Sequence, residues 1–325
     1  MSEPSSQTRM DVSVVIPVYR SSATIRDVAT RVMAVLAGEG LRHELILVDD
    51  GSPDDSWDVL AALHAEHPDR VVAIQLMRNF GQHNALMCGL RRARGDVIVT
   101  MDDDLQHPPE EIPRLLATLR EQSLDLVYGS PEQRYHRRWR NGGSRVLTLL
   151  YRKLFRVDVD FSAFRAVRRE LARSVLTYDL NFTFLDGLLA WNTTRIGAVP
   201  VRHEERGVGA SGYSLSRLLL LSVNMLTNFS LAPLQAVSWL GMAAAGGGLA
   251  LASVFLGLAL AGRMEVPGYA SIIVAVLVLG GAQLLALGII GEYLGRVHLN
   301  INRKPQFVER RMLGRESDAA PNRPD

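Results

Sequence analysis

Two long stretches without a charged side chain constrain this chain of 325 residues more than any other feature of its sequence. They cover residues 231–262 and 266–291, and each is longer than the roughly twenty residues that a helix needs to cross a bilayer. A link of three residues, 263–265, separates them. The pattern therefore predicts a transmembrane hairpin over 231–295. The alternative is a buried helical hairpin of a soluble protein, which stretches of this length disfavour.

Basic side chains flank this predicted hairpin at both ends. They are Arg202, Arg206 and Arg217 before it, and Arg296, Arg303, Lys304, Arg310, Arg311 and Arg315 after it. Because positively charged flanks stay on the cytoplasmic side, we expect both ends of the hairpin and the domain before it in the cytoplasm. Residues 1–9 are polar and have no apolar core, so we expect no signal peptide.

The residues before the hairpin carry the pattern of an α/β domain. Apolar runs rich in β-branched residues lie at 12–18, 45–48 and 97–100, and helical patterns lie near 22–38, 53–66 and 81–93. Such runs are typical of buried parallel strands. Their alternation with helices predicts a doubly wound, mostly parallel sheet.

Two acidic clusters follow strands of that predicted sheet. Asp49 and Asp50 come directly after the second apolar run, and Asp102–Asp104 come after the third. Because ligands bind beyond the carboxyl ends of parallel strands, the two clusters should meet at one edge. Asp102 and Asp104 lie two residues apart, so both can face one Mg²⁺ or Mn²⁺ ion while Asp103 points elsewhere. The alternative is a solvated acidic turn that caps the next helix.

Two further segments suit a membrane surface. Residues 133–157 hold eight Lys or Arg side chains, no Asp or Glu, and several leucines, and residues 213–229 are largely apolar. A basic helix with interleaved apolar residues binds membrane surfaces and attracts a lipid phosphate. Nucleic acid is the rival partner, and the hydrophobic C-terminal part argues against it. We therefore expect a flexible N-terminus (1–10), a cytoplasmic domain (11–210), an interfacial helix (211–230), the hairpin (231–295) and a cytoplasmic tail (296–325).

Five motifs make the interpretation specific. They are VVIPVY at 14–19, VDDGS at 48–52, RNFGQH at 78–83, MDDDLQHPPEEIP at 101–113 and GEYLGR at 291–296. With them the chain resembles the family 2 inverting glycosyltransferases, and within these the polyprenyl-phosphate glycosyltransferases. The resemblance implies a GT-A-like fold, a divalent metal, and sugar transfer from a nucleotide sugar, with UDP favoured, to polyprenyl phosphate. It also implies a homo-oligomer, a tetramer, in the bacterial inner membrane.

The resemblance assigns roles to single residues as well. The nucleotide sugar would be bound by Pro17, Tyr19, Asp49, Asp50, Arg78, Asp102, Arg206, Ser211 and Tyr213. The metal would be held by Asp102 and Asp104. The reacting centre would contain Asp104, Asp160 and Arg165. The acceptor phosphate would meet Arg138, Arg145 and Arg165.

The chain departs from the family pattern in three places. Arg20-Ser21 stands where many relatives have Asn-Glu, and Asp103 stands where Ala is usual. Gly212 replaces a common Lys, which removes one expected phosphate contact.

The acceptor suggests how such an enzyme would react. A phosphate monoester is already anionic near neutral pH, so it can attack the anomeric carbon without a strong general base. Direct displacement inverts the configuration at the anomeric carbon. Asp160 would orient the acceptor or act as a weak base, and the sequence leaves both roles open.

Two other functions fit the same pattern. One is a processive polysaccharide synthase of the same fold, but two spans do not readily build a pore. The other is an inactive membrane scaffold or sugar-nucleotide sensor, which the outer aspartates Asp102 and Asp104 disfavour.

Overall fold

The computed structural model divides the chain into two compact units, one of residues 1–212 and 304–325 and one of residues 213–303. The structure describes residues 10–131, 159, 161–178, 183–203, 230–261, 269–302 and 305–314. Each unit is described by itself below.

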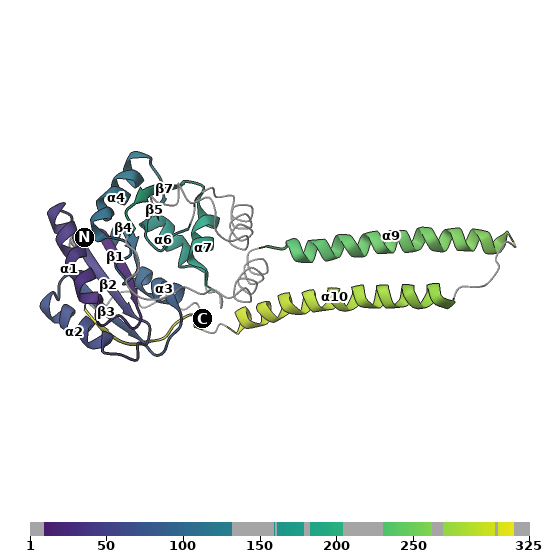
Figure 1. Ribbon diagram of the computed structural model, residues 1–325, viewed down its shortest axis with the longest axis horizontal. Coiled ribbons are helices and arrows are strands. Elements are labelled where there is room, and N and C mark those ends of the chain that lie inside the picture. Colours follow the sequence, from purple (N-terminus) through teal and green to yellow (C-terminus); the bar gives the residue numbers. More distant parts are fainter. Residues whose placement is uncertain are drawn as a thin grey trace, which may run out of the picture. The chain divides into compact units, whose positions relative to one another are not determined.

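An eight-stranded mixed sheet forms the described centre of the first unit, in the order β7-β5-β6-β4-β1-β2-β3-β8 (Figure 1). The strands are β1 (Met10–Val18), β2 (His43–Asp49), β3 (Val71–Leu76), β4 (Gly95–Thr100), β5 (Leu126–Pro131), β6 (Arg165–Arg168), β7 (Ile196–Val201) and β8 (Glu309–Leu313). The four central strands β4, β1, β2 and β3 are parallel. Strand β6 runs antiparallel to β4 and β5, and β8 runs antiparallel to β3.

Helices cover both faces of this sheet. They are α1 (Ile25–Gly38), α2 (Ser56–Glu66), α3 (Gln82–Arg92), a 3₁₀ turn η1 (Pro109–Glu111), α4 (Ile112–Glu121), α6 (Arg169–Val175) and α7 (Leu185–Asn192). Helices α1, α2 and α4 share one apolar core with alternate strand residues such as Val14, Ile16 and Leu47. Helix α3 covers the other face. There Gly89 packs so closely on Val15 that a Cβ added to Gly89 would lie 2.2 Å from the Cγ1 of Val15. Because both faces are buried, the central strands are largely apolar.

The centre of the sheet agrees with the sequence analysis, and its edges add to it. Strands β1, β2 and β4 confirm the apolar runs, and α1, α2 and α3 confirm the helical patterns between them. Strands β3, β5, β6, β7 and β8 were not predicted from the sequence. Strand β8 lies inside the segment 296–325 that was expected to be a tail, and there it pairs with β3.

The second unit contains two long apolar helices, α9 (Ala232–Leu260) and α10 (Tyr269–Ile301). Segments Ala232–Leu251 and Val278–Ile301 are long and apolar enough to cross a membrane, and their side chains are not buried within the described structure. The hydroxyl of Tyr293 on α10 donates to the carbonyl oxygen of Ser230, which precedes α9 (2.6 Å). The two helices therefore run antiparallel and side by side (Figure 1). Helix α10 continues past the expected end at residue 295.

Candidate functional site

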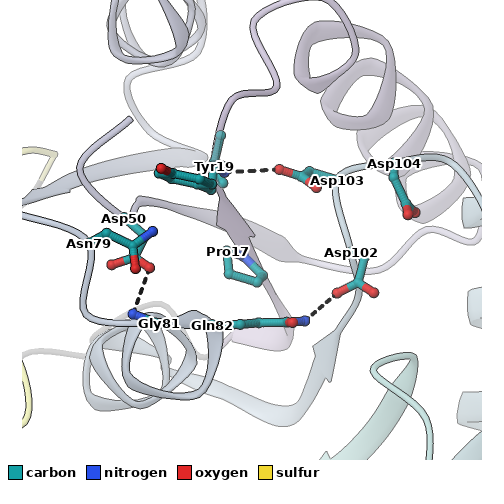
Figure 2. Close-up of a pocket in the computed structure, with 10 residues that line it drawn as sticks. Pro17, Tyr19, Asp50, Asn79, Gly81, Gln82, Asp102, Asp103 and Asp104 are labelled. Atoms are coloured by element: carbon teal, nitrogen blue, oxygen red, sulfur yellow. Dashed lines mark hydrogen bonds between the residues drawn. The ribbon is translucent and has the colours of Figure 1, made fainter. Parts of the chain in front are cut away.

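A pocket of about 310 Å³ opens beyond the carboxyl ends of the central strands (Figure 2). We call it the acidic pocket; it is lined by Pro17, Val18, Tyr19, Asp50, Asn79, Gly81, Gln82, Asp102, Asp103 and Asp104. These residues come from the ends of β1 and β2, the loop after β3, the start of α3 and the loop after β4. The predicted meeting of both acidic clusters at one edge of the sheet is thus present.

Asp50 joins two loops of this pocket. Its carboxylate accepts hydrogen bonds from the backbone N–H groups of Phe80 (2.7 Å) and Gly81 (2.8 Å). Burial raises the pKa of Asp50, and these two hydrogen bonds oppose the shift. The next residue, Gly51, has a φ of +65°, and a Cβ there would lie 2.5 Å from the carbonyl carbon of Arg78. Glycine is therefore required where the two loops meet.

Asp49 lies beneath the acidic pocket rather than in its wall. The residue is fully buried, and its carboxylate accepts hydrogen bonds from Ser52 N (3.0 Å) and Gln75 Nε2 (2.9 Å). Asp49 was expected to bind the nucleotide sugar together with Asp50, but here only Asp50 lines the pocket, and Asp49 supports the turn that carries it. The reason is the alternation of side chains along a strand, which sends neighbouring residues to opposite faces.

The three aspartates after β4 bind different partners. Asp102 accepts a hydrogen bond from Gln82 Nε2 (2.6 Å), and Asp104 accepts one from Gln106 Nε2 (2.5 Å). Asp103 turns the other way, toward Tyr19 (Figure 2), and accepts hydrogen bonds from Tyr19 N (3.2 Å) and Ser21 Oγ (2.5 Å). Burial raises the pKa of Asp103. Asp103 thus diverges from its two neighbours, and the metal role of Asp102 and Asp104 stays a prediction.

Other expected nucleotide contacts lie at the rim. Pro17 and Tyr19 line the acidic pocket, and the Tyr19 side chain is 42% exposed. Arg78 is exposed and does not line the pocket; its guanidinium lies 4.4 Å from the ring centre of Phe80. Arg78 therefore lies on the loop whose backbone N–H groups, at Phe80 and Gly81, donate hydrogen bonds to Asp50.

Arg165 occupies a different place from the expected one. It is 1% exposed, its Nε donates to Thr100 Oγ1 (2.9 Å), and its guanidinium pairs with Asp186 of α7. The hydroxyl of Tyr128 also donates to Asp186 (2.9 Å). Burial alone would lower the pKa of Arg165, but the charge of Asp186 turns the shift upward. Arg165 is thus enclosed between Thr100 and Asp186, and its expected contact with the acceptor phosphate stays a prediction.

Several expected site residues lie outside the described part of the chain. They are Arg138, Arg145, Asp160, Arg206, Ser211 and Tyr213. The basic stretch 133–157 and most of the segment 211–230 lie there too. Their roles stay predictions.

Three glutamines that were not predicted from the sequence lie around the carboxylates. Gln82 and Gln106 hold Asp102 and Asp104, and Gln75 holds Asp49. Gln82 and Gln106 belong to motifs already recognised, and Gln106 continues the two-residue spacing of the outer aspartates. Gln75 belongs to none of these motifs, because it lies near the end of the apolar strand β3.

A mixed α/β sheet with carboxylates beyond its parallel strands has the layout of a nucleotide-binding α/β enzyme. Residues 13–176 match the protein family described as glycosyl transferase family 2. The undecaprenyl-phosphate 4-deoxy-4-formamido-L-arabinose transferase of Pseudomonas aeruginosa is 36% identical over 315 residues, which cover 96% of this chain and 93% of that protein. The enzyme of the same name from Shewanella sediminis is 34% identical over 311 residues, 93% of this chain and 92% of that protein.

Among solved structures, glucosyl-3-phosphoglycerate synthase from Mycobacterium tuberculosis, determined with Mn²⁺ and UDP-glucose, is 23% identical with a TM-score of 0.46. That likeness covers 67% of this chain and 77% of the other.

The chain belongs to glycosyl transferase family 2 and is a glycosyltransferase with the expected GT-A-like fold. The relatives also confirm the resemblance to polyprenyl-phosphate glycosyltransferases that the motifs indicated.

Proposed function

We propose that the protein transfers one sugar from a nucleotide sugar, a UDP-sugar, to polyprenyl phosphate, with inversion at the anomeric carbon. The main support for the proposal is that one chain contains both the acidic pocket and an apolar helical hairpin. Relatives named as undecaprenyl-phosphate sugar transferases support it, since they match 93–96% of the chain, hairpin included. The product would be a lipid-linked sugar for envelope glycan or lipid A modification.

The acidic pocket would hold the nucleotide sugar. The half-exposed ring of Tyr19 offers an apolar face for a base, and the carboxylate of Asp50 offers an acceptor for base N–H or ribose hydroxyl groups. Arg78, on the neighbouring loop, would supply positive charge beside the nucleotide. The outer aspartates lie at the opposite wall, where the diphosphate would reach them.

The carboxylates fit a divalent cation. Within the described residues, no group of three or more His, Cys, Asp or Glu is arranged to hold a metal ion. Two carboxylates are nevertheless sufficient for Mg²⁺ or Mn²⁺ when phosphate oxygens complete the shell. Asp102 and Asp104 would hold the ion, and a bound ion would neutralise charge on the departing nucleoside diphosphate. Gln82 and Gln106 would keep the two carboxylates in place through their hydrogen bonds.

The acceptor would arrive from the membrane. The phosphate is anionic, so the protein must position it and balance its charge rather than remove a proton. Asp160 would orient the acceptor or act as a weak base, and Arg138 and Arg145 would meet the acceptor phosphate. Nucleotide-sugar contacts would come from Arg206, Ser211 and Tyr213. Arg165 takes a supporting role here: its bond to Thr100 fixes the end of β4, next to the outer aspartates.

Topology and assembly are part of the same proposal. The basic flanks support a cytoplasmic location of the acidic pocket at the bacterial inner membrane, with α9 and α10 as the two spans of the protein. We further propose a homo-oligomer, a tetramer, as the family resemblance implies. Native mass spectrometry from lipid nanodiscs measures the subunit number directly, and a monomer would contradict this part.

The test is transfer of labelled sugar from a panel of nucleotide sugars to undecaprenyl phosphate by the full-length protein. One sugar per lipid is the expected product. A polymer would instead support the processive synthase, and no product with any donor would support the inactive scaffold or sensor. The matched control is the Asp104→Asn protein, which should bind lipid yet form no product.

A further inference from the structure

A row of hydrogen-bonded side chains crosses three strands, from the edge of the sheet to the turn beside the acidic pocket. Arg311 of β8 lies opposite Gln75 of β3, and Gln75 lies opposite Asp49 of β2. Arg311 Nε donates to Gln75 Oε1 (2.9 Å), and Gln75 Nε2 donates to Asp49 Oδ2 (2.9 Å). Residues opposite each other on paired strands share a face, so the three side chains form one line.

The inner end of this row fixes a turn of the acidic pocket. The second carboxylate oxygen of Asp49 accepts the backbone N–H of Ser52 (3.0 Å), which closes the turn that carries Asp50. The hydroxyl of Ser52 accepts the backbone N–H of Arg20 (3.2 Å), the residue after Tyr19. A shift of the Asp49 carboxylate would therefore move two walls of the pocket.

The outer end of the row is held by packing. The guanidinium of Arg311 lies 4.2 Å from the ring centre of Trp57 on α2, and Trp57 is 6% exposed. A cation over a Trp face is attracted by the ring and loses freedom there. The row is thus ordered by the protein itself.

Strand β8 also holds the second loop of the acidic pocket. The backbone N–H of Met77 donates to the carbonyl oxygen of Val308 (2.9 Å), and the Arg310 guanidinium donates to the carbonyl oxygen of Met77 (3.2 Å). The loop that begins at Met77 supplies the two backbone N–H groups that bind Asp50. Strand β8 and the residue before it therefore contact the start of this loop directly, and β8 reaches the turn that carries Asp50 only through Gln75 and Asp49.

We propose that Arg311 is a positioning residue of the nucleotide-sugar site, which acts through Gln75 and Asp49 without touching a ligand. The inference rests on the proposed function, because it takes the acidic pocket as the donor site. Since β8 follows the hairpin in the chain, a segment from beyond the membrane part completes the donor site. Ordering a site before its ligand arrives improves affinity, because less freedom is lost on binding.

The experiment measures the dissociation constant for UDP with Mg²⁺, using the full-length protein and the variants Arg311→Ala, Gln75→Ala and their combination. Each single variant should raise Kd by about three- to tenfold, the effect of one or two lost hydrogen bonds. The combination should be no worse than either single variant, because both break the same row. Turnover at saturating donor should change less than Kd, and Arg311→Lys should restore part of the affinity.

Arg92→Ala is the matched control. It removes the ion pair between Arg92 and Glu309 (2.9 Å), which anchors the same strand outside the row. This variant should lower Tm and leave the Kd for UDP unchanged. Additive losses in the combined variant, or an equal rise of Kd in Arg92→Ala, would mean that β8 is merely structural. Unchanged Kd in every variant overturns this inference alone, whereas a wild-type protein with no UDP affinity overturns the proposed function as well.

Discussion

Replacing Asp186 with alanine should lower the free energy of unfolding of the first unit by about 3–5 kcal/mol, the usual cost of breaking a buried ion pair from one side. Arg165 would keep its charge while only 1% exposed, with the neutral hydroxyl of Thr100 still accepting a hydrogen bond from its Nε. Tyr128 would also lose the acceptor of its hydroxyl. Against a total stability of about 5–15 kcal/mol for a domain, this loss is large.

Thermal and urea unfolding, followed by tryptophan fluorescence in detergent, measure the effect. The combined variant Arg165→Met with Asp186→Leu should be much milder, about 1–3 kcal/mol, because both charges are gone and the lost partner of the Tyr128 hydroxyl is the main remaining cost. An Asp186→Ala protein within about 1 kcal/mol of the wild type would refute the argument. So would a combined variant as unstable as the single one.

Three further outcomes follow from the site and the hairpin. Asp104→Asn should abolish transfer while Asp103→Asn loses much less, because Asp103 binds the loop after β1; equal losses in a transfer assay would contradict the pairing of the outer aspartates. Met264→Cys in a Cys88→Ser background should react with an impermeant thiol reagent in intact cells, whereas the wild type, whose Cys88 is buried, should not. Labelling of position 264 only after lysis would contradict the proposed topology. Burial lowers the pKa of His107 from 6.5 to about 4. The stability that depends on a neutral His107 is therefore complete above pH 6.5 and is lost as the pH falls toward about 4. His107→Leu should flatten that part of a Tm–pH curve.

The parts of the fold that sequence could predict are those with an unambiguous burial pattern. The runs at 12–18, 45–48 and 97–100 are apolar because helices cover both faces there. Strand β8, with the sequence ERRML, has no such run, because one side of an edge strand remains open. Its pairing with β3 depends on contacts distant in sequence, which a local pattern does not contain.

The candidate site divides in the same way. The spacing of Asp102 and Asp104 predicted that Asp103 would diverge, and the bonds of Asp103 to Tyr19 and Ser21 agree. The burial of Arg165 was not predictable, because its partner Asp186 carries no signal that it faces inward. Motif likeness places a residue near a site, but it does not say whether the side chain faces a ligand or supports the wall behind it.

The late position of β8 in the chain affects how the protein is made. Residues 10–203 leave the ribosome first, yet the outer side of β3 finds its described partner only when residues 309–313 appear, after both α9 and α10 have been synthesised. Until then β3 is an open edge, which invites pairing with a second nascent chain. Shielding by a chaperone or rapid membrane insertion would protect it. A soluble fragment ending before residue 231 would keep that open edge permanently and should aggregate, whereas one with residues 305–314 fused back should not.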